Sequence, residues 1–201
     1  MKQIEITVRL NERMQEAIRK LEMQGFEKIR ESEIDDIYMT SKLKELNENN
    51  IQNILKKSVL LRSLKLENKE IKKITYKNKE FDEKGDVISE KKINLDCSDL
   101  EKAKDLFEHL EFEELIRVRY KVLVYSKDKI EYAFQDVENL GTLIEYENVE
   151  DFEGKSLNEI NEAKENMYNE IKNTGINLTE EKDVKKAFEL ILNKYFKNID
   201  K

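Results

Sequence analysis

The chain of 201 residues is poor in the residues that build several common kinds of site. Its one cysteine, Cys97, allows neither a disulfide nor a cysteine metal cluster within the chain. Its one histidine, His109, excludes a metal site with several histidine ligands. No apolar run approaches the length of a membrane span, and the N-terminus does not resemble a signal peptide. We therefore expect a soluble cytoplasmic protein with no membrane partner.

The chain also lacks an excess of positive charge. Its formal net charge is -7, whereas a general nucleic-acid binder needs a basic excess to release counterions from phosphates. We therefore expect no nucleic-acid partner. The 37 Lys and Arg residues still allow a local basic pocket for a small polyanion. Apolar residues recur at strand and helix periods, which indicates a folded core rather than disorder.

Strand-like alternation dominates the first 150 residues. In the segment 3–10, Glu5, Thr7 and Arg9 alternate with apolar residues, so a strand would place them on one face. Similar segments follow, and short turns such as "DEKGD" (82–86) and "SKDK" (126–129) separate many of them, which favours an antiparallel sheet. The further expected strands are 33–40, 58–64, 71–81, 87–95, 114–125, 130–137 and 142–149.

Helical patterns interrupt and follow these strands. One begins near Met14, and another spans 98–112 with Ser98 as the expected N-cap. The tail predicts two more helices, 155–173 and 181–197, with Thr179 as the N-cap of the second. We therefore expect a single α+β domain over 1–201, in which residues 1–150 carry the strands and residues 151–201 form a helical tail.

Two architectures fit strands that have one apolar and one charged face. The first is an open antiparallel sheet whose polar side faces water. The second is a closed or nearly closed eight-stranded barrel with a charged interior and helices packed outside. Clustered carboxylates in such an interior suit Mg²⁺ or Mn²⁺, and clustered Arg and Lys suit phosphate. Together they would bind, and could cleave, a triphosphate.

Six segments over residues 2–150 resemble, in order, the motifs of the CYTH superfamily, which includes class IV adenylyl cyclases and thiamine triphosphatases. The entry motif Glu-x-Glu-x-Lys resembles "EITVR" (5–9). The other segments are "DDIYMT" (35–40), "VLLRS" (59–63), "ITYK" (74–77), "LIRVRYKVLVY" (115–125) and "FQDVENLGTLIEYE" (134–147). The resemblance implies an eight-stranded antiparallel tunnel, a small-molecule triphosphate substrate, and Mg²⁺ or Mn²⁺ as cofactor.

The resemblance also implies roles for eight residues. Glu5, Glu145 and Glu147 would bind the metal. Catalysis would rest on Glu5, Arg9 and Arg62. The residues that would bind the triphosphate are Arg9, Arg62, Lys77, Arg117 and Arg119.

Five positions depart from the family pattern. Thr7 stands where the entry motif has its second Glu, Arg9 stands where it has Lys, and Gln135 stands where the last motif has Asp. Glu90 and Lys92 reverse the polarity of an Arg-x-Glu pair. Three functions therefore stay open: hydrolysis of inorganic triphosphate, thiamine triphosphate or a nucleotide; a cyclase that makes cyclic AMP; and a non-catalytic module that binds polyphosphate or nucleotide. A homodimer through the tail helices is also left open.

Overall fold

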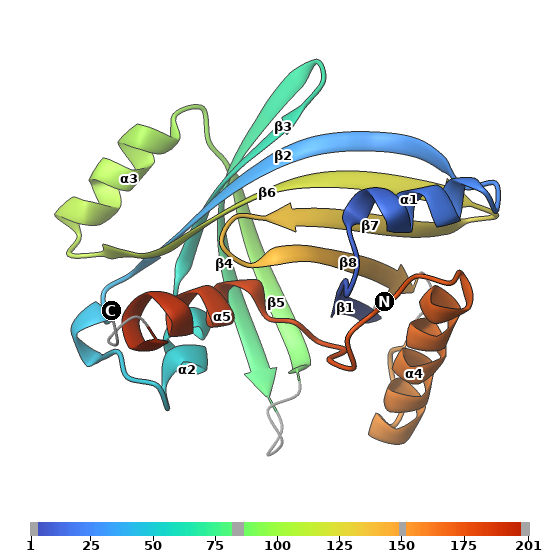
Figure 1. Cartoon of the computed structure of the whole chain (residues 1–201). Coiled ribbons are helices and arrows are strands. Elements are labelled where there is room, and N and C mark those ends of the chain that lie inside the picture. The colour runs from blue at the N-terminus through green and yellow to red at the C-terminus, as the bar shows by residue number, and fades with distance from the viewer. Residues whose placement is uncertain (1–3, 82–86, 149–151, 198–201) are drawn as a thin grey trace. The chain divides into compact units, whose positions relative to one another are not determined.

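The computed structural model describes residues 4–81, 87–148 and 152–197 (Figure 1). Its strands form one eight-stranded antiparallel sheet in the order β1-β8-β7-β6-β2-β3-β4-β5, and helices accompany it. The predicted α+β fold with an eight-stranded antiparallel sheet is confirmed. The hydrogen-bonded order ends at β1 and β5, so no ladder among the described residues joins these two strands.

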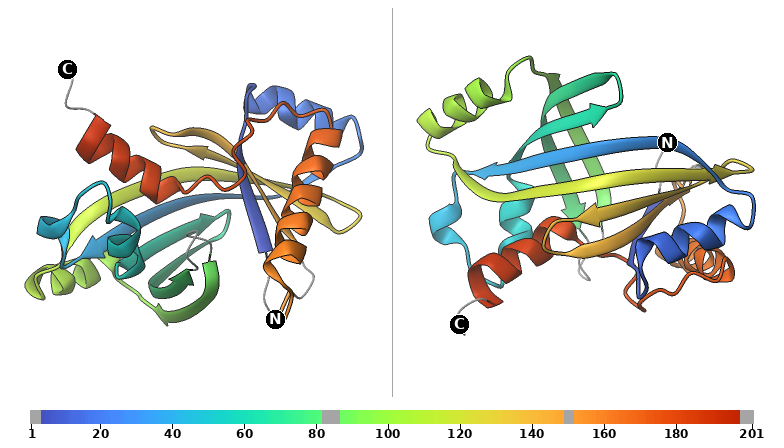
Figure 2. Two further views of the ribbon diagram at one scale, coloured as in Figure 1. Left: turned by 90° about the horizontal axis from the view of Figure 1, so that it is seen from below. Right: turned by 45° about the horizontal axis from the view of Figure 1, so that its top comes forward.

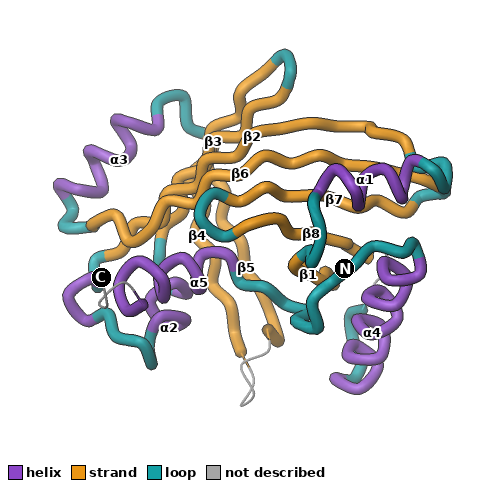
Figure 3. Tube along the Cα trace, in the orientation of Figure 1, coloured by secondary structure: helices purple, strands orange, loops and turns teal. Residues whose placement is uncertain are grey.

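Figure 3 shows the strands and helices by type. The strands are β1 (Ile4–Arg9), β2 (Glu27–Thr40), β3 (Val59–Leu66), β4 (Lys69–Phe81), β5 (Val87–Asp96), β6 (Glu113–Lys127), β7 (Ile130–Val137) and β8 (Gly141–Asn148). The α-helices are α1 (Met14–Glu22), α2 (Ile51–Lys56), α3 (Leu100–His109), α4 (Leu157–Asn173) and α5 (Lys186–Leu192). Short 3₁₀ and π segments lie at Leu43–Glu45 and Asn193–Lys197. The predicted turn at 82–86 lies outside the described residues.

The internal packing divides the chain into two compact units. The first comprises residues 1–32 and 120–185, and the second comprises residues 33–119 and 186–201. Strands β2 and β6 each contribute residues to both units. No helix among the described residues is long and apolar enough to cross a membrane.

The core of the first unit lies on the apolar face of β1, β7 and β8. Ile6, Phe134 and Ile144 are fully buried there, because strand alternation puts them opposite the charged residues of the same strands. Leu21 of α1 and Ile171 of α4 are also fully buried in this cluster. Figure 2 shows α4 beside β1. Full burial of each such side chain contributes about 1.5–3 kcal/mol of hydrophobic stabilisation.

The backbone conformation between β6 and β7 identifies the type of turn that joins them. Asp128 and Lys129 both have positive φ, of 50° and 71°. Two successive residues with positive φ are typical of the type I′ turn, whose twist matches that of the flanking strands. The hairpin turn predicted at 126–129 is therefore confirmed.

The segment after α4 covers the edge of β1 that does not pair with β8. The Thr179 backbone N–H donates to the Arg9 carbonyl at 3.0 Å, and the Val184 N–H donates to the Thr7 carbonyl at 2.9 Å. The prediction that Thr179 caps a helix over 181–197 is wrong, since α5 begins only at Lys186. Backbone hydrogen bonds to the edge strand take the place of that first helical turn, and they protect the edge from pairing elsewhere.

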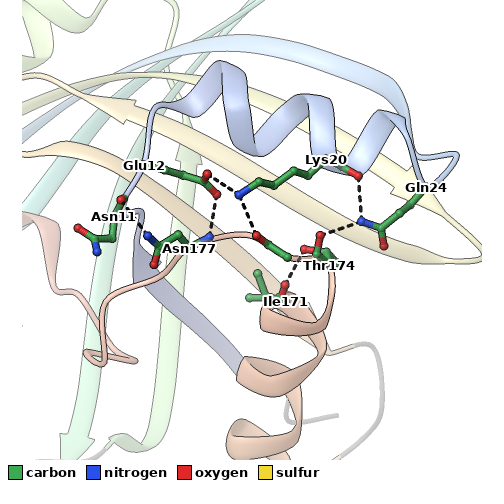
Figure 4. Close-up of polar contacts among 8 residues, drawn as sticks. Asn11, Glu12, Lys20, Gln24, Ile171, Thr174 and Asn177 are labelled. Carbon is green, nitrogen blue, oxygen red and sulfur yellow. Dashed lines mark hydrogen bonds and ion pairs between the residues drawn. The ribbon is translucent and has the colours of Figure 1, made fainter.

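A polar cluster fixes the start of this segment against α1 (Figure 4). Glu12, whose side chain is 9% exposed, accepts hydrogen bonds from Lys20 Nζ at 2.5 Å and from the Asn177 backbone N–H at 2.7 Å. Lys20 Nζ also donates to the Gly175 carbonyl at 2.8 Å. Gln24 donates to the Thr174 carbonyl at 2.8 Å. Side chains of α1 and its N-terminal approach therefore hold the chain at 174–177.

The second unit packs α3 against the face of β2 and β3 that carries Ile37, Met39 and Leu61. The N-cap of α3 is Asp99, whose carboxylate accepts a hydrogen bond from the Lys102 backbone N–H at 3.1 Å. The prediction of Ser98 as N-cap is wrong by one residue. Strand β2 begins at Glu27 rather than at residue 33. The sequence did not predict its first part, because residues 27–31 are exposed and show no apolar alternation.

We expect Glu12→Ala to lower the free energy of unfolding by about 1–3 kcal/mol, because it leaves the Asn177 N–H and the Lys20 ammonium without their shared acceptor. Urea unfolding followed by circular dichroism measures the change. Glu16→Ala is the matched control, since Glu16 is an exposed acid in the first turn of the same helix. Equal effects of the two substitutions would contradict a role for this cluster in stability.

Candidate anion-binding pocket

The second unit contains a pocket of about 260 Å³ on the face of β3, β4 and β5 that carries Arg62. These three strands lie side by side in the views of Figures 1 and 2. Residues two apart on a strand share a face, so the antiparallel register places Arg62 opposite Lys73, and Thr75 opposite Asn94. The lining residues are Leu60, Arg62, Leu64, Ile71, Lys73, Thr75 and Asn94.

Asp36 holds the guanidinium of Arg62. The two residues are directly opposite in the β2–β3 register. Arg62 Nε and Nη2 donate to the two carboxylate oxygens of Asp36, both at 2.6 Å. The Asp36 side chain is only 3% exposed, whereas that of Arg62 is 33% exposed. This bidentate pair fixes the orientation of Arg62 and balances its charge.

Lys73 is the second cation of the pocket, and its charge is not balanced in this way. Within the described part of the chain, its side chain makes no hydrogen bond or ion pair. Beside it, Thr75 Oγ1 donates to Asn94 Oδ1 at 2.9 Å, which leaves the Asn94 amide nitrogen to act as a donor. The pocket therefore presents an ammonium group and an amide donor to an anion.

Arg117 and Arg119 lie on the opposite face of the sheet from Arg62. Asp35 and Asp36 are successive residues of β2, so their side chains point to opposite faces. Arg117 donates to the two Asp35 oxygens at 2.8 and 2.6 Å, and Arg119 Nε is 3.6 Å from Asp35 Oδ2. The structure therefore does not bring Arg117 and Arg119 together with Arg62, as the resemblance implied. The sequence predicts that Arg117 and Arg119 share one face of β6. It does not reveal whether that face is the one on which Arg62 lies in β3, because this depends on how the strands pair.

The ion pair with Arg117 changes the acidity of both partners. Burial by itself would raise the pKa of Asp35, but the hydrogen bond and charge of Arg117, with the charge of Arg119, hold this pKa below its usual value. Asp35 in turn raises the pKa of Arg117 above its ordinary value. Asp35 is therefore ionised at neutral pH and keeps both guanidinium groups on its own face.

The first unit carries the other predicted site residues on one polar face. The β1–β8 register places Glu5 opposite Glu147, and Thr7 opposite Glu145. Arg9 shares this face, and its Nη1 donates to the Leu140 carbonyl at 2.6 Å. The structure therefore brings Glu5, Arg9, Glu145 and Glu147 to one side of the two strands.

The two neutral replacements noted in the sequence are buried on this face. Gln135 is 3% exposed and donates from Nε2 to Glu145 Oε2 at 2.9 Å. Thr7 is 7% exposed. In the described residues, no group of three or more His, Cys, Asp or Glu side chains is arranged to hold a metal ion. Glu5, Glu145 and Glu147 thus share a face without forming a three-ligand site among the described residues.

Some site residues were missed from the sequence, and some lie outside the description. Lys73, Thr75 and Asn94 line the pocket, although no motif indicated them. Polar residues alternate in phase along 71–79 and along 87–95, and this pattern could have indicated a shared polar face. The sequence alone does not show that the two strands pair so that Thr75 lies opposite Asn94. The side chains of Lys77, Glu90 and Lys92 lie outside the described part of the structure.

Known proteins of similar fold support the predicted family resemblance. No family model matches the chain. The PH1819 protein from Pyrococcus horikoshii OT3 has a similar structure, with a TM-score of 0.69 and 24% identity over 96% of this chain and 99% of that one. A "putative adenylate cyclase" from Vibrio parahaemolyticus matches with a TM-score of 0.62 and 13% identity over 95% of this chain and 97% of that one.

A curated relative adds a match in sequence. "Putative adenylate cyclase MJ0240" of Methanocaldococcus jannaschii is 34% identical over 89 residues, which are 44% of this chain and 46% of the relative. The aligned segment thus spans less than half of that protein. The similar structures confirm the predicted fold, and the names of two of the similar proteins are consistent with the resemblance to the CYTH superfamily.

We expect Asp36→Asn to lower the free energy of unfolding by about 2 kcal/mol, because it leaves Arg62 without the buried carboxylate that balances it. Asp35→Asn is the matched control on the neighbouring position. Its pair with Arg117 is 31% and 37% exposed, so the loss should stay below about 1 kcal/mol. Urea unfolding at pH 7 measures both, and a larger effect at Asp35 would contradict the assigned roles.

Proposed function

We propose that the protein binds a linear triphosphate compound and that the pocket on β3, β4 and β5 receives its phosphate. The observation that carries this proposal is Lys73, a cation in a pocket with no partner among the described residues, beside an arginine that Asp36 holds in place. An ammonium group binds phosphate as a point charge, and the adjacent Asn94 amide can donate a hydrogen bond. The CYTH-type fold supports this choice of ligand.

Hydrolysis of the bound triphosphate is the reaction that we propose for the same protein, with Mg²⁺ or Mn²⁺ supplied in solution. One observation favours it over binding alone: Glu5, Arg9, Glu145 and Glu147 share one face of β1 and β8. The CYTH resemblance assigns these residues to catalysis and metal binding, and a carboxylate is a side chain that can act as general base toward water. The cyclase reaction is the alternative, and the names of two similar proteins support it.

We expect tripolyphosphate to raise the melting temperature of the wild-type protein by several degrees once its concentration far exceeds the dissociation constant. Lys73→Gln should remove most of this shift, because it deletes the cation that the pocket leaves unbalanced. Differential scanning fluorimetry across a titration measures the effect, with sodium sulfate at equal ionic strength as the reference.

Lys72→Gln is the matched control for this experiment. Lys72 is next to Lys73 on β4 and faces the other side of the sheet, so the two variants lose the same charge from opposite faces. The proposal expects Lys72→Gln to keep the tripolyphosphate shift. A shift that survives in Lys73→Gln and disappears in Lys72→Gln would place the anion on the wrong face and overturn the proposed site.

We expect incubation with ATP or tripolyphosphate and Mn²⁺ to release phosphate without cyclic AMP, and Glu145→Gln to abolish the release. Glu131→Gln, an exposed acid on β7, is the control that should keep it. Chromatography of the products distinguishes the alternatives. Cyclic AMP with pyrophosphate would indicate the cyclase, and ligand binding with no product would indicate a binding module.

A further inference from the structure

We infer that the pocket on β3, β4 and β5 binds an amphiphilic anion: one phosphate group at Lys73 that carries an apolar substituent packed on an aliphatic wall. The inference rests on the proposed binding of an anion at Lys73. It goes beyond that proposal because a bare chain of phosphates makes no use of an aliphatic wall, whereas a phosphate monoester of a hydrocarbon group does.

The wall lies next to the cations along the β3–β4 ladder. Three cross-strand pairs follow one another on the pocket face: Leu60 with Thr75, Arg62 with Lys73, and Leu64 with Ile71. Residues two apart on a strand are separated by about 7 Å. An apolar group attached directly to a phosphate at Lys73 would therefore reach Leu64 and Ile71.

Among the described lining residues, one cation is left to bind a phosphate group of the ligand. Asp36 balances Arg62 through its two hydrogen bonds of 2.6 Å. Lys73 is then the lining cation without a partner among the described residues. A single phosphate can be matched by this one ammonium group, so one phosphate of the ligand is enough to use the lining charge that the structure describes.

The size and burial of the wall fit a small apolar group. The pocket volume of about 260 Å³ lies just below the range of roughly 300–1,000 Å³ that is usual for drug-sized ligands. Leu60 is 2% exposed and is therefore firmly packed, while Leu64 and Ile71 are half-buried and accessible to a ligand. Contact with these side chains would remove apolar surface of both partners from water.

Isothermal titration calorimetry with phenyl phosphate, inorganic phosphate and tripolyphosphate tests the inference. We expect phenyl phosphate to bind the wild-type protein about tenfold more tightly than inorganic phosphate, because its ring is removed from water against the wall. Leu64→Asn should abolish this preference. Ile93→Asn is the matched control, since Ile93 is 50% exposed on the opposite face of the same sheet. Lys73→Gln should weaken the binding of both monophosphates.

The outcomes separate this inference from the proposed function. Equal affinities for phenyl phosphate and inorganic phosphate, with tight binding of tripolyphosphate, would overturn the inference and leave the proposed function standing. No binding of any of the three anions would overturn both. A series of methyl, butyl and hexyl phosphate on the wild-type protein gives a second test that needs no variant. Affinity should rise along the series, and a flat series would overturn the inference.

Discussion

The bidentate ion pair between Asp36 and Arg62 is the interaction on which the pocket depends. A carboxylate that is 3% exposed needs a charged partner, and Arg62 supplies two hydrogen bonds of 2.6 Å from the neighbouring strand. The pair therefore favours the register in which these residues are directly opposite each other. That register decides which β3 residues face the pocket and, through the β3–β4 ladder, brings Lys73 beside them.

The same stretch of β2 also separates the basic residues of the second unit. Asp36 binds Arg62 on one face of the sheet, while Asp35 pairs with Arg117 and Arg119 on the other face. A surface with three guanidinium groups would suit a highly charged ligand, but among the described residues the pocket face has Lys73 as the cation without a partner, beside an aliphatic wall. The three guanidinium groups therefore do not converge, and the pocket offers a ligand the ammonium group of Lys73 beside an aliphatic wall. For this reason we propose an anion with an apolar substituent for this pocket.

Local sequence patterns predict most of the strands and helices. They do not predict which strands pair or in which register. The alternation around Glu5 and Arg9 predicts β1 and its charged face, and the eight strands follow from the same rule. The opposed faces of Arg62 and Arg117 depend on pairing with Asp36 and Asp35, which no local period reveals. Residues 181–185 were predicted as helix, whereas α5 begins at Lys186. The sequence could not show this, because the bond from the Val184 N–H to the Thr7 carbonyl joins residues far apart in the chain.

A crystal structure of the protein soaked with tripolyphosphate is the most direct test of where the anion binds. The account predicts phosphate density within hydrogen-bond distance of Lys73 Nζ, with the Asp36–Arg62 pair intact. Density bound instead to Arg117 and Arg119, with Lys73 uninvolved, would contradict it.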